Sequence, residues 1–340
     1  MRKSEKEISS LKKDLVDLIG SHYPDAVEDQ VCQEMLLNIG QLRQEKLDIV
    51  ELKLLSTAFK ELRYALKVFK PYRLIPKAAV FGSARTPLGH LSFRQAREFG
   101  RKLARKGWML ITGGASGIME AAMIGAGAEK SFGLNILLPF EQDANPVIKG
   151  NEKLVYFKYF FTRKLMFLKE SQATVLFPGG FGTFDEGFES FTLVQTGKAR
   201  PRPQVLIDTY DSSYWGSTLK LLKRNLEGYG LISKADLSLI RHFQDADLAV
   251  DEIVGFFANY DSSRFLRDRY LIRLHKPIKP EDLARMNRDF KDILTRGTFE
   301  RMADITDDDN KNPTLERLIF HFDKASYARL RLLIDFLNSL

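Results

Sequence analysis

The spacing of hydrophobic positions changes twice along this chain of 340 residues. Up to about residue 75, apolar side chains recur every three or four positions, which predicts amphipathic helices. Between 76 and about 260, short apolar runs alternate with segments of helical spacing, which predicts alternating strands and helices. From 261 on, two further strand-and-helix pairs follow. The pattern predicts three parts: N-terminal helices over 1–75, a domain of alternating strands and helices over 76–260, and a small α+β appendage over 261–340.

The N-terminal part carries one apolar stripe that ends before Pro71 and Pro76, two residues that interrupt helices. A stripe of this kind packs on its own domain more often than it forms a dimer interface, and both interpretations stay open. Its members are Leu52, Leu55, Phe59, Leu62, Leu66 and Phe69.

The middle part predicts an α/β fold, a doubly wound parallel sheet of Rossmann-like type. In such a sheet, ligands bind at the carboxyl ends of the strands. Glycine-bearing turns follow the first, second and fifth predicted strands, so we expect these turns at the same sheet edge. Helices are expected over about 91–106, after Gly117, and around Arg163. The predicted strands are Lys77–Phe81, Trp108–Thr112, Phe132–Leu138, Lys153–Phe157, Ala173–Phe177 and Gln204–Ile207.

The turn from Pro178 to Glu186 is the most informative segment, because it contains three glycines and ends on two acids. Glycine lets the backbone approach a ligand, and a helix N-terminus offers free N–H groups to an anion. The helix is expected from Gly187 on. An alternative interpretation is a capping box formed by Thr183 and Glu186, which satisfies N–H groups at a helix start. That alternative does not explain the glycines.

Arg163 and Lys164 give a second indication of an anion site. If Thr162 is the N-cap of the next helix, both cations lie in its first turn, where the helix dipole disfavours positive charge by about 0.3–1 kcal/mol. A bound anion would offset this cost. The alternative is that both side chains extend into water.

The C-terminal part predicts strands over Arg269–Leu274 and Leu315–Phe320, and helices over 280–294 and 324–338. The acidic run from Asp307 to Asn312 lacks the glycine and the final glutamate of an EF-hand, so we expect a solvated loop there.

Composition narrows the function classes. The net charge of +8 suits a phosphorylated small molecule or weak attraction to nucleic acid, but no nucleic-acid motif is present. Cys32 is the only cysteine, which excludes an intrachain disulfide and a thiolate metal cluster, and the five histidines show no ligand spacing. No apolar segment is long enough to span a membrane and the start lacks a signal-type core, so we expect a cytoplasmic protein.

Taken together, four segments resemble the LOG family, phosphoribohydrolases that activate cytokinins, and its larger bacterial relatives that act on nucleoside 5′-monophosphates. Sequences of this type often carry the label lysine decarboxylase-like. The resemblance covers roughly 76–260. It rests on Phe81–Arg85, Thr112–Glu120, Arg163-Lys164 and Pro178–Glu186.

The resemblance implies roles for individual residues. Arg163 and Glu186 would form the catalytic pair, and the glycine turn would hold the 5′-phosphate. It implies no metal or organic cofactor, and homodimers or higher homo-oligomers with shared sites. Phe161-Thr162 stands where the family has Met-His, and Asp185 where many members have Glu. The residues expected to bind substrate are Gly82, Ser83, Gly114, Glu141, Lys164, Gly179, Gly180, Phe181, Gly182, Thr183, Glu189 and Thr192.

By this resemblance, the predicted function is hydrolysis of the N-glycosidic bond of nucleoside 5′-monophosphates, with no nucleic-acid or membrane partner. The alternative is a nucleotide-binding or sensing protein without turnover. A dinucleotide-dependent oxidoreductase is disfavoured, because the glycine turn lacks the third small residue and follows the fifth strand. The absence of a glycine-lysine-serine/threonine loop disfavours an NTPase, and no lysine is identifiable as a pyridoxal site of a decarboxylase.

Overall fold

The computed structural model describes residues 27–138, 143–302, 308 and 312–340. The chain forms two compact units, one up to Lys60 and one from Glu61 on. The predicted division at 75 and 260 stays a prediction. None of the helices among the described residues is long and apolar enough to cross a bilayer.

The first unit contains α2 (Val27–Gln44) and the beginning of α3 (Ile49–Phe69). Asp48 starts α3, because its carboxylate accepts the N–H groups of Val50 and Glu51, while the Glu51 carboxylate accepts the N–H of Asp48. Along the predicted stripe, Phe59 is exposed, whereas Phe69 is buried in the core of the second unit. The stripe therefore packs on the sheet at its C-terminal end.

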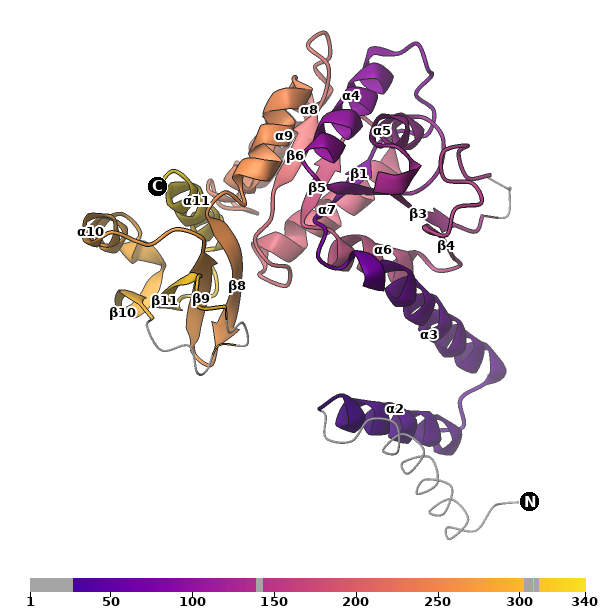
Figure 1. The fold of residues 1–340 in the computed structure, drawn as a ribbon, viewed down its shortest axis with the longest axis horizontal. Helices are drawn as coiled ribbons and strands as arrows, with labels where there is room; N and C mark the ends of the chain where they lie inside the picture. Colours follow the sequence, from indigo (N-terminus) through magenta and orange to yellow (C-terminus); the bar gives the residue numbers. More distant parts are fainter. Residues whose placement is uncertain (1–26, 139–142, 303–307, 309–311) are drawn as a thin grey trace. The chain divides into compact units, whose positions relative to one another are not determined.

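The second unit is built on a parallel seven-stranded sheet in the order β4-β3-β2-β1-β5-β6-β7 (Figure 1). This confirms the predicted α/β fold. The order reverses between β1 and β5, the place where such sheets bind ligands. The strands are β1 (Lys77–Phe81), β2 (Met109–Thr112), β3 (Ser131–Ile136), β4 (Leu154–Phe157), β5 (Ala173–Leu176), β6 (Gln204–Ile207) and β7 (Ile240–Phe243).

Helices cover both faces of this sheet (Figure 1). One face packs against α4 (Leu91–Arg105), α5 (Ile118–Ala126) and α9 (Ala246–Gly255). The other face packs against the end of α3, α6 (Phe160–Glu170), α7 (Phe181–Gln195) and α8 (Tyr214–Leu222). Short 3-10 or π-helical turns occupy Lys70–Tyr72, Ala128–Lys130, Lys223–Glu227, Asp236–Leu239 and Lys291–Ile293.

The C-terminal region forms an antiparallel sheet in the order β10-β11-β9-β8, with its own apolar core. The helix predicted over 280–294 ends at Asp289, and a strand that the pattern did not predict begins at Leu294. The elements are β8 (Tyr260–Leu266), β9 (Arg269–Leu274), α10 (Pro280–Asp289), β10 (Leu294–Arg301), β11 (Glu316–Phe322) and α11 (Tyr327–Asn338).

Asp308 contradicts the prediction of a solvated acidic loop. Its carboxylate is buried and accepts hydrogen bonds from Nε of Arg273 at 3.0 Å and from Nε of Arg317 at 2.7 Å. The two guanidinium groups supply the charge that burial of a carboxylate requires. Asp307 and residues 309–311 lie outside the described residues.

Candidate active site

The three glycine-bearing turns meet at the carboxyl ends of β2, β1 and β5, which are neighbours in the sheet. The N–H of Ser83 donates to the carbonyl of Pro178 at 3.0 Å, and the N–H of Ile118 donates to the carbonyl of Ser83 at 3.0 Å. Ser116 Oγ donates to the carbonyl of Ala84 at 2.8 Å. These bonds join the three turns into one wall, as the sequence predicted.

The turn after β5 leads directly into α7, six residues earlier than expected. Gly180 is the N-cap, and no side chain caps the helix, so the capping box of Thr183 and Glu186 is not formed. The first N–H groups of a helix, here those of Phe181 and Gly182, have no acceptor within it. They offer an anion a binding position at the end of the sheet.

Gly179 is required at this turn by close approach. A Cβ atom at this position would lie 2.1 Å from Thr183 Oγ1 and 3.0 Å from the backbone nitrogen of Ser83. Its carbonyl accepts a hydrogen bond from the Tyr214 hydroxyl of α8. The turn is therefore held from two sides.

A cavity of about 660 Å³ opens in front of this wall, within the size range of small-molecule sites. Eight of the residues predicted from the sequence line it. They are Gly82, Ser83, Arg163, Gly180, Phe181, Gly182, Thr183 and Glu186.

Arg163 of α6 and Glu186 of α7 face each other in this cavity. Their side chains are 14% and 8% exposed, and Arg163 Nη2 lies 3.6 Å from Glu186 Oε1. This distance exceeds a direct hydrogen bond, so each group retains bonding capacity for a ligand. Arg163 Nε is buried without a partner among the described residues, and the guanidinium lies 5.0 Å from the ring centre of Phe160.

Burial raises the pKa of Glu186 to about 7, while the charges of Arg163 and Lys164 act in the opposite direction. Burial likewise lowers the pKa of Arg163, against the charge of Glu186. A carboxyl group that titrates near neutral pH inside a cavity has the property expected of a catalytic acid or base.

The α6 helix begins earlier than predicted. Its N-cap is Tyr159, so Arg163 and Lys164 lie beyond the first turn. Thr162 is buried, and its hydroxyl donates to Glu61 Oε2 at 2.6 Å instead of capping the helix. The prediction of Thr162 as N-cap was wrong, because Glu61, distant in sequence, takes its hydroxyl.

The remaining predicted residues lie elsewhere. Lys164 Nζ binds Glu189 Oε2 at 2.7 Å, and both side chains line a different cavity. Gly114 packs behind the wall, where its carbonyl accepts the N–H of Asn145 at 2.8 Å. Thr192 is exposed on α7. Glu141 lies outside the described residues.

Sequence reasoning did not select Asn135 of β3, although it lines the cavity. The side chain is 4% exposed, and its Nδ2 has no hydrogen-bond partner among the described residues. The sequence feature that could have identified Asn135 is an amide side chain inside the otherwise apolar run Phe132–Leu138. Arg85 and Met119, which lie within the motifs of the resemblance, also line the cavity.

Residues 116–253 match the protein-family model described as "Possible lysine decarboxylase". The matched segment includes Arg163 and Glu186 and confirms the resemblance inferred from the motifs. The matched domain belongs to the LOG family. The family supports a nucleotide-related function for the chain. Among the described residues, no group of three or more His, Cys, Asp or Glu side chains could hold a metal ion.

Solved structures that resemble the chain cover 53% of it. A molybdenum cofactor carrier protein from Chlamydomonas reinhardtii has 22% identity, a TM-score of 0.37 and 98% of its own chain covered. A molybdenum cofactor binding protein from Rippkaea orientalis has 18% identity and a TM-score of 0.36, with 96% of its own chain covered. DNA processing protein A from Helicobacter pylori has 15% identity and a TM-score of 0.37, with 80% of its own chain covered. No curated protein matches the chain. Similarities at this level say nothing about the activity of the LOG-family domain.

Proposed function

We propose that the protein hydrolyses the N-glycosidic bond of nucleoside 5′-monophosphates, releasing the free base and ribose 5-phosphate. The observation that carries this proposal is the pair of buried, oppositely charged side chains Arg163 and Glu186, which face a glycine-lined helix N-terminus across one cavity. A simple anion site would have no use for a carboxylate at that position.

In this proposal the glycine turn binds the phosphate of the substrate. The N-terminus of α7 contributes backbone N–H groups and the positive end of its dipole. Ser83, on the neighbouring turn, lines the same cavity. Binding energy from a phosphate remote from the reacting bond holds the sugar in reactive geometry.

In this proposal the Glu186 carboxylate lies next to C1′ of the ribose, the carbon at which the bond breaks. Cleavage breaks the bond between C1′ and the base nitrogen, whose electron pair leaves with the base. Water adds its oxygen to C1′, and the proton it loses balances the proton that the base gains. Because positive charge develops on the sugar ring, an ionised carboxylate next to it stabilises the transition state or orients the water. Arg163 would position the phosphate or the departing base.

The test is release of ribose 5-phosphate from AMP, GMP, IMP, CMP and UMP by the full chain. We expect Glu186→Gln to lower kcat/KM about 100-fold or more against the best substrate. Asp251→Asn, which makes the same chemical change at an exposed position on α9, is the control and should stay near the parent.

Undiminished activity in a folded Glu186→Gln protein would remove this carboxylate from the mechanism. Tight nucleotide binding with no base released on long incubation would instead support the alternative, a nucleotide-binding protein without turnover.

A further inference from the structure

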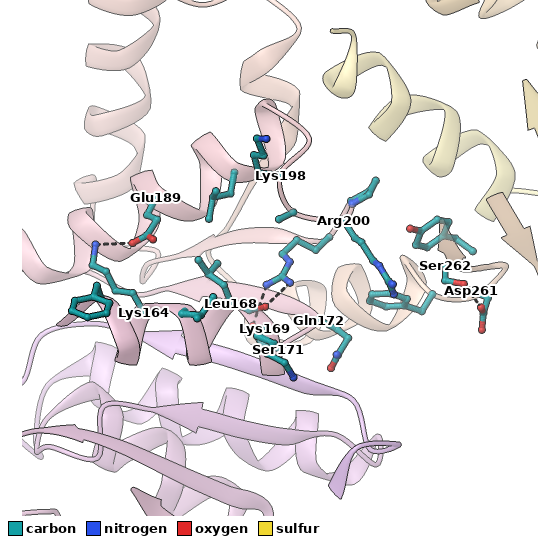
Figure 2. Close-up of a pocket in the computed structure, with 18 residues that line it drawn as sticks. Lys164, Leu168, Lys169, Ser171, Gln172, Glu189, Lys198, Arg200, Asp261 and Ser262 are labelled. Atoms are coloured by element: carbon teal, nitrogen blue, oxygen red, sulfur yellow. Dashed lines mark hydrogen bonds and ion pairs between the residues drawn. The ribbon is translucent and has the colours of Figure 1, made fainter. Parts of the chain in front are cut away.

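A second cavity, of about 840 Å³, lies on the other side of α6 (Figure 2). It is bounded by α6, α7, the segment 198–202 and the start of β8. It has no lining residue in common with the candidate active site. The helix α6 separates the two cavities, because Arg163 and Phe167 line one of them and Lys164, Leu165 and Leu168 line the other.

The charges lining this cavity are unbalanced, because five cations face two carboxylates, those of Glu189 and Asp261. Lys164 is neutralised by Asp185 and Glu189, as Figure 2 shows for Glu189, and Lys169 is paired with Glu170. Three further cations come from the segment between α7 and β6, and among the described residues no ion pair to a carboxylate is found for any of them. They are Lys198, Arg200 and Arg202.

Arg202 is the most constrained of these cations. Its Nη1 donates to Ser171 Oγ at 3.1 Å and its Nη2 to the carbonyl of Leu168 at 2.8 Å, while its Nε is buried without a partner among the described residues. Burial lowers the pKa of Arg202 to about 10; Tyr260 acts in the opposite direction, and the neighbouring charge of Arg200 acts in the same direction as burial. A guanidinium in this position is bonded only to neutral groups.

Burying a charge without a counter-ion costs free energy, and a second guanidinium nearby adds repulsion. An anion bound between the three cations would offset both costs, and several phosphate oxygens match the fork-shaped donors of arginine. The cavity also has apolar walls, formed by Leu168, Leu193 and Phe257. These walls suit a ligand that carries an apolar or planar portion beside its phosphates.

We propose that this cavity is a second binding site, separate from the candidate active site, for a small molecule that carries two or more phosphate groups. Lys198, Arg200 and Arg202 bind the phosphates, and the apolar wall contacts the rest of the ligand. The assignment stands on this cavity alone and does not depend on the proposed hydrolysis.

The test is calorimetric titration of the full chain with inorganic pyrophosphate. Because the glycine turn also binds phosphate under the proposed function, the titration is repeated in Gly180→Asp. A Cβ at Gly180 meets nothing within 4 Å, and aspartate is a favourable N-cap whose carboxylate would repel a phosphate there. We expect Gly180→Asp to retain pyrophosphate binding, with an affinity that falls as salt rises.

Adding Arg200→Gln or Lys198→Gln to Gly180→Asp should weaken that binding by about tenfold or more, and Arg200→Lys by less, since lysine keeps the charge but not the fork. Both side chains are exposed, so the variants should fold. Arg97→Gln, an exposed position on α4, is the matched control and should leave the affinity unchanged. The proposal is overturned by loss of all binding in Gly180→Asp, by equal affinity after Arg200→Gln, or by no binding of millimolar pyrophosphate to the parent.

Discussion

Glu186 is a carboxyl group whose surroundings decide at which pH it carries charge. Burial raises its pKa to about 7, so the fraction of carboxylate falls as pH drops below that value. If the reaction needs the carboxylate, kcat/KM should decline about tenfold per pH unit on the acid side of pH 7. Arg163→Gln removes a charge that lowers this pKa, so its acid limb should move to higher pH.

Both measurements are steady-state pH profiles with the same substrate, so ionisation of the substrate phosphate affects them equally. Coincident limbs in the parent and Arg163→Gln, or a flat profile between about pH 5 and pH 8, would show that Glu186 does not set the limb.

Asn135 offers the cavity a buried amide donor without a partner. Asn135→Val should therefore weaken nucleotide binding, raising KM about tenfold, whereas the free energy of unfolding should hold or rise by about 1 kcal/mol. Urea unfolding and steady-state kinetics give the two quantities. A variant that loses stability while KM is unchanged would identify Asn135 as structural.

Some residues of the site could be predicted and others could not. Arg163 and Glu186 followed from the motifs, but the sequence could not show that Lys164 turns away from them. Successive residues of a helix project about 100° apart, and here Lys164 lines the cavity on the other side of α6 from Arg163. Asn135 was not selected from the sequence, because the spacing of apolar residues does not reveal which face of a buried strand borders the ligand.

Among the elements, strands buried on both faces were predicted well. The bounds of β1, β6 and β9 agree with the apolar runs, because such strands are nearly continuous in hydrophobic residues. The strands β7, β8 and β10 were missed, since most of their side chains are half-buried or exposed and many carry polar groups. The start of α7 was missed because Gly182 disfavours a helix by propensity alone.

Replacing either of two glycines at the start of α7 by alanine should change the free energy of unfolding in opposite directions. Gly179→Ala would place its Cβ against Thr183 Oγ1 and the Ser83 nitrogen, and should cost about 1–3 kcal/mol of unfolding free energy. Gly182→Ala meets nothing within 4 Å and should stabilise the helix by about 0.5–1 kcal/mol. Chemical denaturation measures both. Equal effects of the two changes would contradict the close packing of this turn.

At the scale of the unit from Glu61 on, the C-terminal region packs against the parallel-sheet domain. Arg331 of α11 is bonded to Glu252 of α9, and Arg241 of β7 to Asp335 of α11 at 2.7 Å. The sequence predicted β9, β11, α10 and α11 of the C-terminal region but not this contact, because ion pairs between distant segments leave no periodic signal. The packing shapes the second cavity, since that cavity is lined by both regions.

Gly197 lies at this contact, with φ of +69° and with Tyr327 occupying the place of a side chain, 1.9 Å from where a Cβ would be. Gly197→Ala should cost about 2–4 kcal/mol, because it combines backbone strain with a steric clash. Hydrogen exchange should show the loss of protection concentrated in α11 and residues 198–202. Protection like that of the parent throughout would mean that the two regions do not depend on this contact.

The sheet order also has a consequence for when the candidate active site forms during synthesis. Ala78 of β1 pairs with Ala173 of β5, and the chain builds β2, β3 and β4 before it returns to the centre. Closing so long a loop is slow, and a chain emerging from the ribosome cannot complete it until β5 has left the exit tunnel. A nascent polypeptide that stops before β5 would therefore expose the unfilled edge of β1 and lack the candidate active site.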